Sequence, residues 1–217
     1  MLSVAGRKPA AVFVDPVARA LLRIGLTANA VTVIGCVGVI ALTLGLIPTG
    51  HFGWALVLGA VVSCFDLFDG TMARMSGGGT RFGATLDASC DRLADGAIFA
   101  GFLWWEIAAA RTGELGVSRS TVAATLLVLV TSPVISYVKA RAEASGLHAS
   151  GGLVERLERI VAAGIALVLL QLGVPYGLDV VMWVLAAGSV ITVIQRLVRA
   201  SRDAAAGGHI AAPEGAQ

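Results

Sequence analysis

The chain has 217 residues, of which 57% are hydrophobic and 14% are charged, and its mean hydropathy is +0.84. Soluble domains carry about 25% charged residues, so this composition excludes an ordinary soluble domain and indicates a protein embedded in a bilayer. The net charge is only +2, so the chain lacks the strong positive charge that is typical of nucleic-acid-binding domains. The three cysteines lie in apolar stretches, and their odd number argues against a disulfide framework.

The first predicted element is an amphipathic helix over residues 11–24. Phe13 and Leu21 fall on one helical face, while Arg19 and Arg23 fall on the opposite face. An apolar face beside a basic one is typical of a helix that lies in the membrane interface. A soluble amphipathic helix is the weaker interpretation, because the segments that follow are so apolar.

Six apolar segments come next, each long enough to cross a hydrocarbon core of about 30 Å. Their expected bounds are 28–47, 53–75, 82–109, 120–142, 153–172 and 178–199. We therefore expect an all-α integral membrane protein with six transmembrane helices preceded by the interfacial helix. Residues 1–203 are expected to form a single membrane domain, and residues 204–217 a disordered tail.

Lysine and arginine are distributed very unevenly between the two predicted sides of the membrane. Thirteen fall on one side, two (Arg111 and Arg119) fall on the other, and Arg92 lies within a span. The thirteen are Arg7, Lys8, Arg19, Arg23, Arg74, Arg81, Lys139, Arg141, Arg156, Arg159, Arg196, Arg199 and Arg202. Because cytoplasmic loops carry the excess of positive charge, we expect both termini and the glycine break at 77–79 to be cytoplasmic, in a multi-pass protein of the cell membrane.

Four carboxylates lie at helical spacing on either side of this glycine break. Asp66 and Asp69 are three residues apart, and Asp87 and Asp91 are four residues apart, so each pair shares one helix face. The break at residues 76–79 lets the chain turn back, so that both faces can point at one place. The active site is therefore expected here, at the cytoplasmic ends of the second and third spans.

The cost of burying these carboxylates indicates what compensates them. Each ionised Asp at mid-membrane costs roughly 2.5–3.5 kcal/mol on insertion scales, so a purely structural role for all four is unfavourable. Arg74 and Arg92 are nearby, but two arginines are not a compact partner for four carboxylates. Oxygen ligands select hard divalent ions such as Mg²⁺ or Mn²⁺ and leave positions open for phosphate oxygens.

The spacing of these residues resembles a known motif, Asp-x2-Asp-Gly-x2-Ala-Arg-x8-Gly-x3-Asp-x3-Asp, without departures. The matching positions are Asp66, Asp69, Gly70, Ala73, Arg74, Gly83, Asp87 and Asp91. The motif is that of the CDP-alcohol phosphotransferase family, and the six-span layout with its interfacial first helix is similar too. Residues 77–83, 139–146 and 155–159 most closely resemble the sequences of the actinobacterial phosphatidylinositol-phosphate synthases.

The resemblance implies a role for each part of the site. Two Mg²⁺ or Mn²⁺ ions would be held by Asp66, Asp69, Asp87 and Asp91, with Asp91 also acting as the general base. A pocket for the CDP-lipid would be formed by Asn29, Thr32, Gly70, Ala73, Arg74 and Thr80. Thr80 would also open the third span, and Gly83 would either admit the nucleotide or, as we favour, pack the second span against the third.

The acceptor alcohol is predicted from basic residues at the cytoplasmic ends of spans four to six. These residues, Lys139, Arg156, Arg159 and Arg196, could form a pocket for an acceptor that carries its own phosphate. This favours inositol 1-phosphate (1D-myo-inositol 3-phosphate) or glycerol 3-phosphate over free alcohols, and the resemblance favours inositol phosphate. The expected reaction transfers a phosphatidyl group from CDP-diacylglycerol and releases CMP, in an enzyme that the resemblance implies to be a homodimer among membrane lipids.

Two alternatives remain. A phosphatidylglycerophosphate synthase would use the same motif and metals with glycerol 3-phosphate. A divalent-cation transporter could also carry carboxylates in its spans, but it would be expected to line a path across the bilayer with them, whereas these four cluster on one side.

Overall fold

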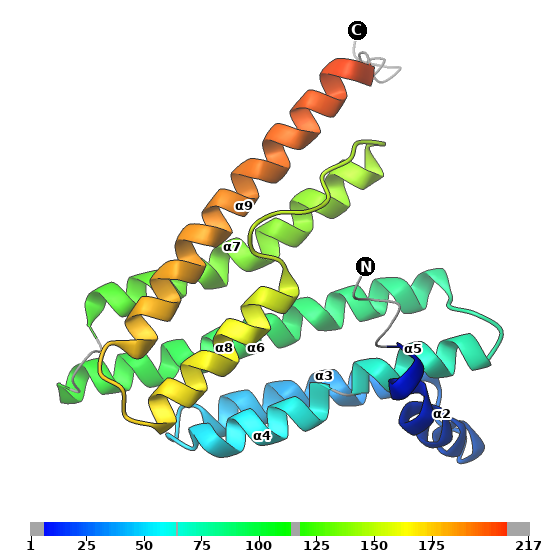
Figure 1. Cartoon of the computed structure of the whole chain (residues 1–217), viewed down its shortest axis with the longest axis horizontal. Helices are drawn as coiled ribbons and strands as arrows, with labels where there is room; N and C mark the ends of the chain where they lie inside the picture. The colour runs from blue at the N-terminus through cyan, green and yellow to red at the C-terminus, as the bar shows by residue number, and fades with distance from the viewer. Residues whose placement is uncertain (1–6, 64, 114–117, 208–217) are drawn as a thin grey trace, which may run out of the picture.

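The computed structural model describes residues 7–63, 65–113 and 118–207, and within these ranges every regular element is an α-helix (Figure 1). The helices are α2 Arg7–Arg23, α3 Ala28–Leu46, α4 Phe52–Ser63, α5 Phe65–Met75, α6 Arg81–Thr112, α7 Arg119–Ala144, α8 Arg156–Gln171 and α9 Gly177–Gly207. Cys36 and Cys90 are free and buried, as expected for cysteines outside a disulfide framework, and Cys64 lies outside the described residues.

Five helical segments are long and apolar enough to cross a membrane. They are Ala28–Leu46, Phe52–Met75, Arg81–Thr112, Arg119–Ala144 and Gly177–Ala205, which coincide with five of the six expected spans. The remaining segment, expected at 153–172, is shorter than predicted because residues 146–155 form an irregular loop and α8 begins only at Arg156. The described part of the protein is therefore all-helical with five candidate membrane spans, and the count of six is not confirmed.

The two ends of the chain are more helical than expected. Helix α2 begins at Arg7 rather than near residue 11, and its Ala18 packs in a small apolar cluster with Val31 of α3 and Met72 of α5. Helix α9 continues to Gly207, past the start of the predicted tail at residue 204, and residues 208–217 lie outside the described part. The interfacial position of α2 stays a prediction.

The helices are arranged around α3 and α6. Helices α7 and α9 pack along one another and project together as an arm, while α2 lies at the opposite end of the molecule, beneath α5 (Figure 1). Helix α3 packs against α4, α5 and α6, and α8 packs against α4 and α9. A large apolar core, which includes Ile47, Phe52, Phe99, Phe102 and Met182, joins these helices away from the carboxylates.

Helix α3 can contact both halves of the acidic motif because small residues line its crossings. A Cβ at Gly35 would lie 3.1 Å from Cβ of Phe65 in α5, and one at Gly101 of α6 would lie 2.9 Å from the backbone oxygen of Thr43. Small residues allow such close approach of helices in a membrane. The carboxylates of α5 and α6 are thus brought together across α3.

Candidate active site

The glycine break between α5 and α6 forms a tight turn. Gly77 and Gly78 have φ angles of 96° and 111°, which glycine adopts without the strain that a side chain would add. Thr80 then caps α6, because its Oγ1 accepts a hydrogen bond of 2.9 Å from the backbone N–H of Gly83. The predicted helix break and the predicted start of the third span are confirmed.

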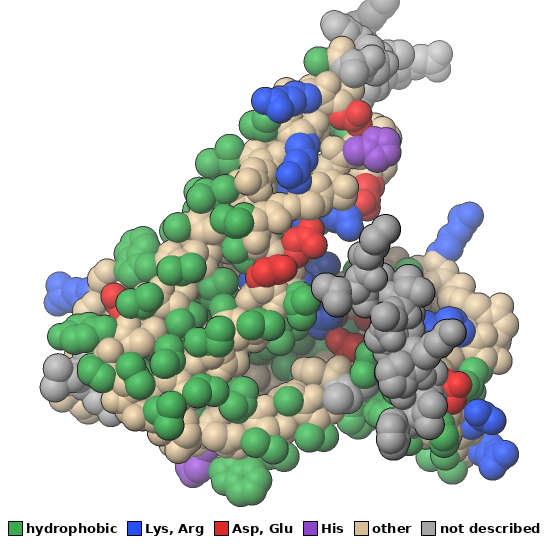
Figure 2. All heavy atoms as spheres, in the orientation of Figure 1, with side chains coloured by type: hydrophobic (Ala, Val, Ile, Leu, Met, Phe, Trp, Pro, Cys, Tyr) green, Lys and Arg blue, Asp and Glu red, His purple; other side chains and the backbone are tan. Residues whose placement is uncertain are grey.

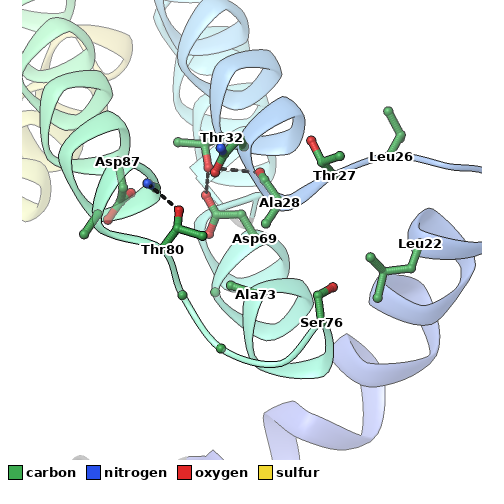
Figure 3. Close-up of a pocket in the computed structure, with 16 residues that line it drawn as sticks. Leu22, Leu26, Thr27, Ala28, Thr32, Asp69, Ala73, Ser76, Thr80 and Asp87 are labelled. Carbon is green, nitrogen blue, oxygen red and sulfur yellow. Dashed lines mark hydrogen bonds between the residues drawn. The ribbon is translucent and has the colours of Figure 1, made fainter.

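A cavity of about 460 Å³ lies inside this turn (Figure 3). This volume falls within the range of small-molecule sites, roughly 300–1,000 Å³. It is lined by Leu22, Leu26, Thr27, Ala28, Asn29, Thr32, Asp69, Gly70, Ala73, Ser76, Gly78, Gly79, Thr80, Gly83, Ala84 and Asp87. Carboxylates thus face one part of the cavity, while leucines from α2 and the segment after it face another, as an amphipathic ligand requires.

Five of the six residues expected to bind the CDP-lipid line this cavity, and Arg74 does not. Instead, the Nη2 atom of Arg74 donates a hydrogen bond of 2.8 Å to Oγ1 of Thr71 in its own helix. The Arg74 side chain is exposed. Its motif position places it one helical turn after Gly70, which does line the cavity.

The two motif glycines have different surroundings. A Cβ at Gly70 would be in ordinary van der Waals contact with Nη1 of Arg74, at 3.6 Å, so the guanidinium of Arg74 lies next to Gly70. A Cβ at Gly83 would lie 3.1 Å from both Oδ1 of Asn29 and Oγ1 of Thr80. The expectation that Gly83 packs the second span against the third is not what the structure shows: the neighbours of Gly83 are the start of α3 and the cap of α6.

A second, small cavity of about 40 Å³ adjoins the first and shares Thr32 and Asp87 with it. It is lined by Thr32, Gly35, Cys36, Val39, Ser63, Asp66, Asp87, Cys90, Asp91, Ala94, Asp95, Ile98, Arg156 and Ile160. Asp69 faces the larger cavity, Asp66 and Asp91 face the smaller one, and Asp87 borders both. The structure therefore brings all four motif carboxylates to two adjoining spaces.

Three of the four motif carboxylates, Asp66, Asp69 and Asp91, have side-chain partners in the structure. Oγ1 of Thr32 donates a hydrogen bond to Oδ2 of Asp69, as the dashed line between them shows (Figure 3). The Nη2 atom of Arg156 lies 2.7 Å from Oδ1 of Asp91 and 3.2 Å from Oδ2 of Asp66. A single guanidinium from α8 therefore bridges one carboxylate of α5 and one of α6.

The donor set fits a hard divalent ion in its chemistry, because it consists of carboxylate oxygens alone. Within the ranges that the structure describes, no three carboxylate, histidine or cysteine side chains converge tightly enough to form a ready-made metal site. The reason is visible in the contacts: Arg156 stands between Asp66 and Asp91 as a cation, while Asp69 is turned to Thr32. Coordination by all four would require Asp69 to leave Thr32, and Asp66 and Asp91 to leave Arg156.

Asp95 is a polar residue of the site that lies outside the acidic motif. It is 3% exposed, and its Oδ2 accepts a hydrogen bond of 2.6 Å from Nη2 of Arg159, which is 2% exposed. The Nε and Nη1 atoms of Arg159 are buried without a hydrogen-bond partner among the described residues. The available signal was the continuation of the i, i+4 stripe of aspartates one turn beyond Asp91.

The predicted acceptor residues are only partly brought together. Arg156 and Arg159 reach the carboxylates, whereas Lys139 is half-exposed and lies 3.8 Å from Glu143 of its own helix. Arg196 is 5% exposed and holds the loop before α8. Its guanidinium donates hydrogen bonds to the backbone oxygens of Gly151 (2.9 Å) and Ile135 (2.7 Å) and to Glu155 (3.2 Å).

The surface of the molecule agrees with this arrangement. Figure 2 shows acidic and basic side chains gathered in the hollow between the arm of α7 and α9 and the end that carries α2 and α5. Hydrophobic side chains cover most of the rest of the visible face. Exposed large apolar side chains on every spanning helix, such as Val37, Trp54, Val130 and Val184, are typical of a surface that faces lipid.

The comparison with known proteins decides the family. The model of the CDP-alcohol phosphatidyltransferase family matches residues 25–195, which include the whole acidic motif and both cavities apart from Leu22. The chain belongs to this family. It is accordingly a phosphatidyltransferase, as its acidic motif indicated.

Relatives with the same family motif are similar along nearly the whole chain. A phosphatidylinositol phosphate synthase of Corynebacterium glutamicum is 49% identical over 217 residues, covering 100% of this chain and 97% of the relative. A protein of the same name from Mycobacteroides abscessus is 51% identical over 199 residues, covering 91% of this chain and 87% of the relative.

Solved structures of this family show the same fold. The phosphatidylinositol phosphate synthase of Mycobacterium tuberculosis with CDP-DAG bound has a TM-score of 0.80 and 45% identity, covering 92% of this chain and 98% of that one. The same enzyme in complex with manganese and citrate has a TM-score of 0.77 and 44% identity, covering 90% and 92%. At this identity the likeness extends beyond the fold to the family.

Proposed function

We propose that this protein transfers the phosphatidyl group of CDP-diacylglycerol to inositol 1-phosphate, giving phosphatidylinositol phosphate and CMP. Relatives of about half-identical sequence carry the name of this activity, and a structural relative binds CDP-DAG. The observation that carries the proposal is the junction of the two cavities at Thr32 and Asp87. The larger cavity, which is the size of a small-molecule site, therefore adjoins the small acidic cavity, which Arg156 also lines.

In this proposal the larger cavity binds the CDP-lipid. Its apolar side at Leu22 and Leu26 suits the lipid end, and the absence of a side chain at Gly70 lets the nucleotide approach the backbone closely. Asn29 and Thr80 offer polar atoms beside Gly83, where a side chain would intrude. Arg74 contributes only if its guanidinium turns from Thr71 towards the cavity.

The four motif aspartates form the metal set. Asp66, Asp69 and Asp87 would hold one divalent ion, and Asp66, Asp87 and Asp91 would hold a second. When bound, Mg²⁺ or Mn²⁺ neutralises the diphosphate and stabilises charge on the attacking and leaving oxygens. Manganese in the relative from M. tuberculosis supports this choice of ion.

Asp91 is proposed as the general base. Its carboxylate borders the small cavity beside Asp87 and so lies where an acceptor hydroxyl would meet the diphosphate. It would take the hydroxyl proton while the hydroxyl oxygen bonds to the β-phosphorus and the bond from that phosphorus to the CMP oxygen breaks. CMP then leaves, and the carboxylic acid returns its proton to water.

Arginines next to the acidic cavity favour an acceptor that carries a phosphate. Arg159 has two buried donor nitrogens without partners in the described structure, and such donors are costly unless an anion or water satisfies them. Arg156 lies at the rim between Asp66 and Asp91. Arg196 supports this side by fixing the loop before α8, and Lys139 would have to leave Glu143 in order to reach it.

The membrane arrangement follows from charge and length. The thirteen-to-two distribution of Lys and Arg supports cytoplasmic termini and a cytoplasmic active site. We include α8 as a sixth span, since its 16 residues pack beside α4 and α9, and α2 as a helix in the cytoplasmic interface. A homodimer in the cell membrane completes this proposal.

The acceptor can be tested directly. Purified protein in detergent or liposomes is supplied with CDP-diacylglycerol, Mn²⁺ or Mg²⁺, and either inositol 1-phosphate or glycerol 3-phosphate, and CMP release and the lipid product are measured. We expect CMP and phosphatidylinositol phosphate with inositol 1-phosphate only. A phosphatidylglycerophosphate product would assign the alternative synthase, and Mn²⁺ flux across the liposome without CMP release would assign a transporter.

A further inference from the structure

Arg156 makes an unusual set of contacts for a residue at the beginning of a helix. It comes from the first turn of α8, yet its Nη2 atom lies 2.7 Å from Asp91 and 3.2 Å from Asp66. Its Nε atom lies 3.6 Å from Oδ1 of Asp95. One guanidinium therefore touches carboxylates from both halves of the motif and from the next turn of α6.

Asp66 and Asp91 are also the carboxylates that the proposed metal set needs. Each contacted oxygen, Oδ2 of Asp66 and Oδ1 of Asp91, directs one of its lone pairs at the guanidinium, so an ion that approaches between the two carboxylates meets the guanidinium in that position. Two positive groups on the same pair of carboxylates would also repel each other, and in a low-dielectric surrounding this repulsion is large. The guanidinium and the ion are therefore competitors for these oxygens.

We propose that Arg156 is a tethered counter-cation that competes with divalent metal for Asp66 and Asp91 and that withdraws when metal binds. The inference rests on the metal part of the proposed function and adds a residue that sets metal affinity. By pairing with these two carboxylates, Arg156 limits their mutual repulsion. It also lowers the affinity of the protein for metal, because every binding event must break its contacts.

The neighbours of Arg156 have contacts that do not depend on Asp66 or Asp91. At the beginning of α8, the Glu155 backbone N–H donates a hydrogen bond of 2.9 Å to Glu158. Asp95, which lies 3.6 Å from the Nε atom of Arg156, is paired with Arg159 at 2.6 Å. Withdrawal of Arg156 would therefore break its contacts with Asp66 and Asp91 without breaking the Arg159–Asp95 pair or the hydrogen bond at the beginning of α8.

Metal binding, measured without substrate, tests the competition. Wild-type protein and the Arg156→Gln and Arg156→Lys variants are stripped with EDTA and titrated with Mn²⁺, and the dissociation constant is read by calorimetry or by the electron paramagnetic resonance of free Mn²⁺. The loss of a charged hydrogen bond that metal must otherwise break predicts about tenfold tighter Mn²⁺ binding in Arg156→Gln. Arg156→Lys keeps the positive charge but lacks the planar, bidentate guanidinium. Its affinity for Mn²⁺ should therefore lie between those of wild type and Arg156→Gln.

Thermal unfolding in detergent gives a second reading. In EDTA, Arg156→Gln should unfold at a lower temperature than wild type, because Asp66 loses its cationic partner and Asp91 keeps only Arg92, whose Nη1 atom lies 3.4 Å from its Oδ2. Mn²⁺ should then raise its unfolding temperature by more than it raises that of wild type. Arg141→Gln is the matched control, since Arg141 is an exposed arginine on the same side of the protein, and its Mn²⁺ affinity should equal that of wild type.

The outcomes separate this inference from the function on which it rests. If neither wild type nor Arg156→Gln binds Mn²⁺, the metal site of the proposed function fails. If both bind Mn²⁺ with equal affinity, or if Arg156→Gln or Arg156→Lys binds it more weakly than wild type, the metal site stands and the competition is overturned. An equal tightening in Arg141→Gln would also overturn it, because general charge rather than contact would then be responsible.

Discussion

Arg159 of α8 and Asp95 of α6 form an ion pair of 2.6 Å inside the helix bundle, with side chains 2% and 4% exposed. Removal of Asp95 leaves the buried charge of Arg159 unpaired, and removal of Arg159 leaves Asp95 with only the Nε atom of Arg156, 3.6 Å away. Breaking a buried pair in this way costs about 3–5 kcal/mol. Asp95→Asn and Arg159→Met should therefore each lower the free energy of unfolding by about this amount, as measured by thermal or denaturant unfolding in detergent.

The double variant distinguishes a pair from two independent contacts. Asp95→Asn combined with Arg159→Met leaves no unpaired charge at this contact and should be more stable than at least one of the single variants. Additive losses in the double variant would show that the two residues act separately.

The hydrogen bond from Thr32 to Asp69 should orient this carboxylate for catalysis. Thr32→Val removes the donor at nearly constant volume, and a hydrogen bond to a charged group contributes about 1.5–3 kcal/mol. We expect kcat/KM for the CDP-lipid to fall by about tenfold or more. Thr43→Val is the control, because Thr43 is buried in the same helix but its hydroxyl bonds only to backbone oxygens of α3. Equal effects of both variants would remove the role given to Thr32.

Gly83 should be required because of the space that it leaves open. In Gly83→Ala the new methyl group would lie 3.1 Å from both Asn29 and Thr80, which lie at the cavity. The KM for CDP-diacylglycerol should rise several-fold, while the KM for the acceptor should change little. Gly96→Ala, in the same helix with nothing within 4 Å, should behave as wild type. Wild-type KM values in Gly83→Ala would contradict the assignment of this cavity to the CDP-lipid.

Arg196 should hold the loop that leads to Arg156. Arg196→Gln removes charged hydrogen bonds to Gly151, Ile135 and Glu155, and each such bond contributes about 1.5–3 kcal/mol. Backbone amides of residues 147–155 should exchange hydrogen for deuterium at least about tenfold faster, as read by mass spectrometry. Arg202→Gln, an exposed change in the same helix, is the control. Unchanged exchange in Arg196→Gln would leave Arg196 free to bind the acceptor, as its sequence position first indicated.

Much of the fold and the centre of the site could be predicted because they depend on short-range patterns. The spacing of Asp66, Asp69, Asp87 and Asp91 fixes which helix faces they share, and the glycines after α5 fix where the chain turns. The positive charge and apolar lengths likewise indicated five spans that the structure contains.

The remaining features depend on contacts between distant segments. Whether Arg196 meets a ligand or the carbonyl of Gly151 is decided by how the loop before α8 folds back on α9. Hydropathy placed the start of the fifth span at residue 153, because Leu153 and Val154 are apolar although they belong to that loop. The pairing of Asp95 with Arg159 joins residues 64 positions apart, and no local pattern contains it.

The most direct test of the central claim is the turnover of Asp91→Asn. With CDP-diacylglycerol, inositol 1-phosphate and saturating Mn²⁺, loss of a general base that also borders the metal site should reduce CMP release by at least about a hundred-fold. Glu143→Gln, which removes an exposed carboxylate near the C-terminal end of α7, should keep wild-type turnover. CMP release by Asp91→Asn at the wild-type rate would contradict the account.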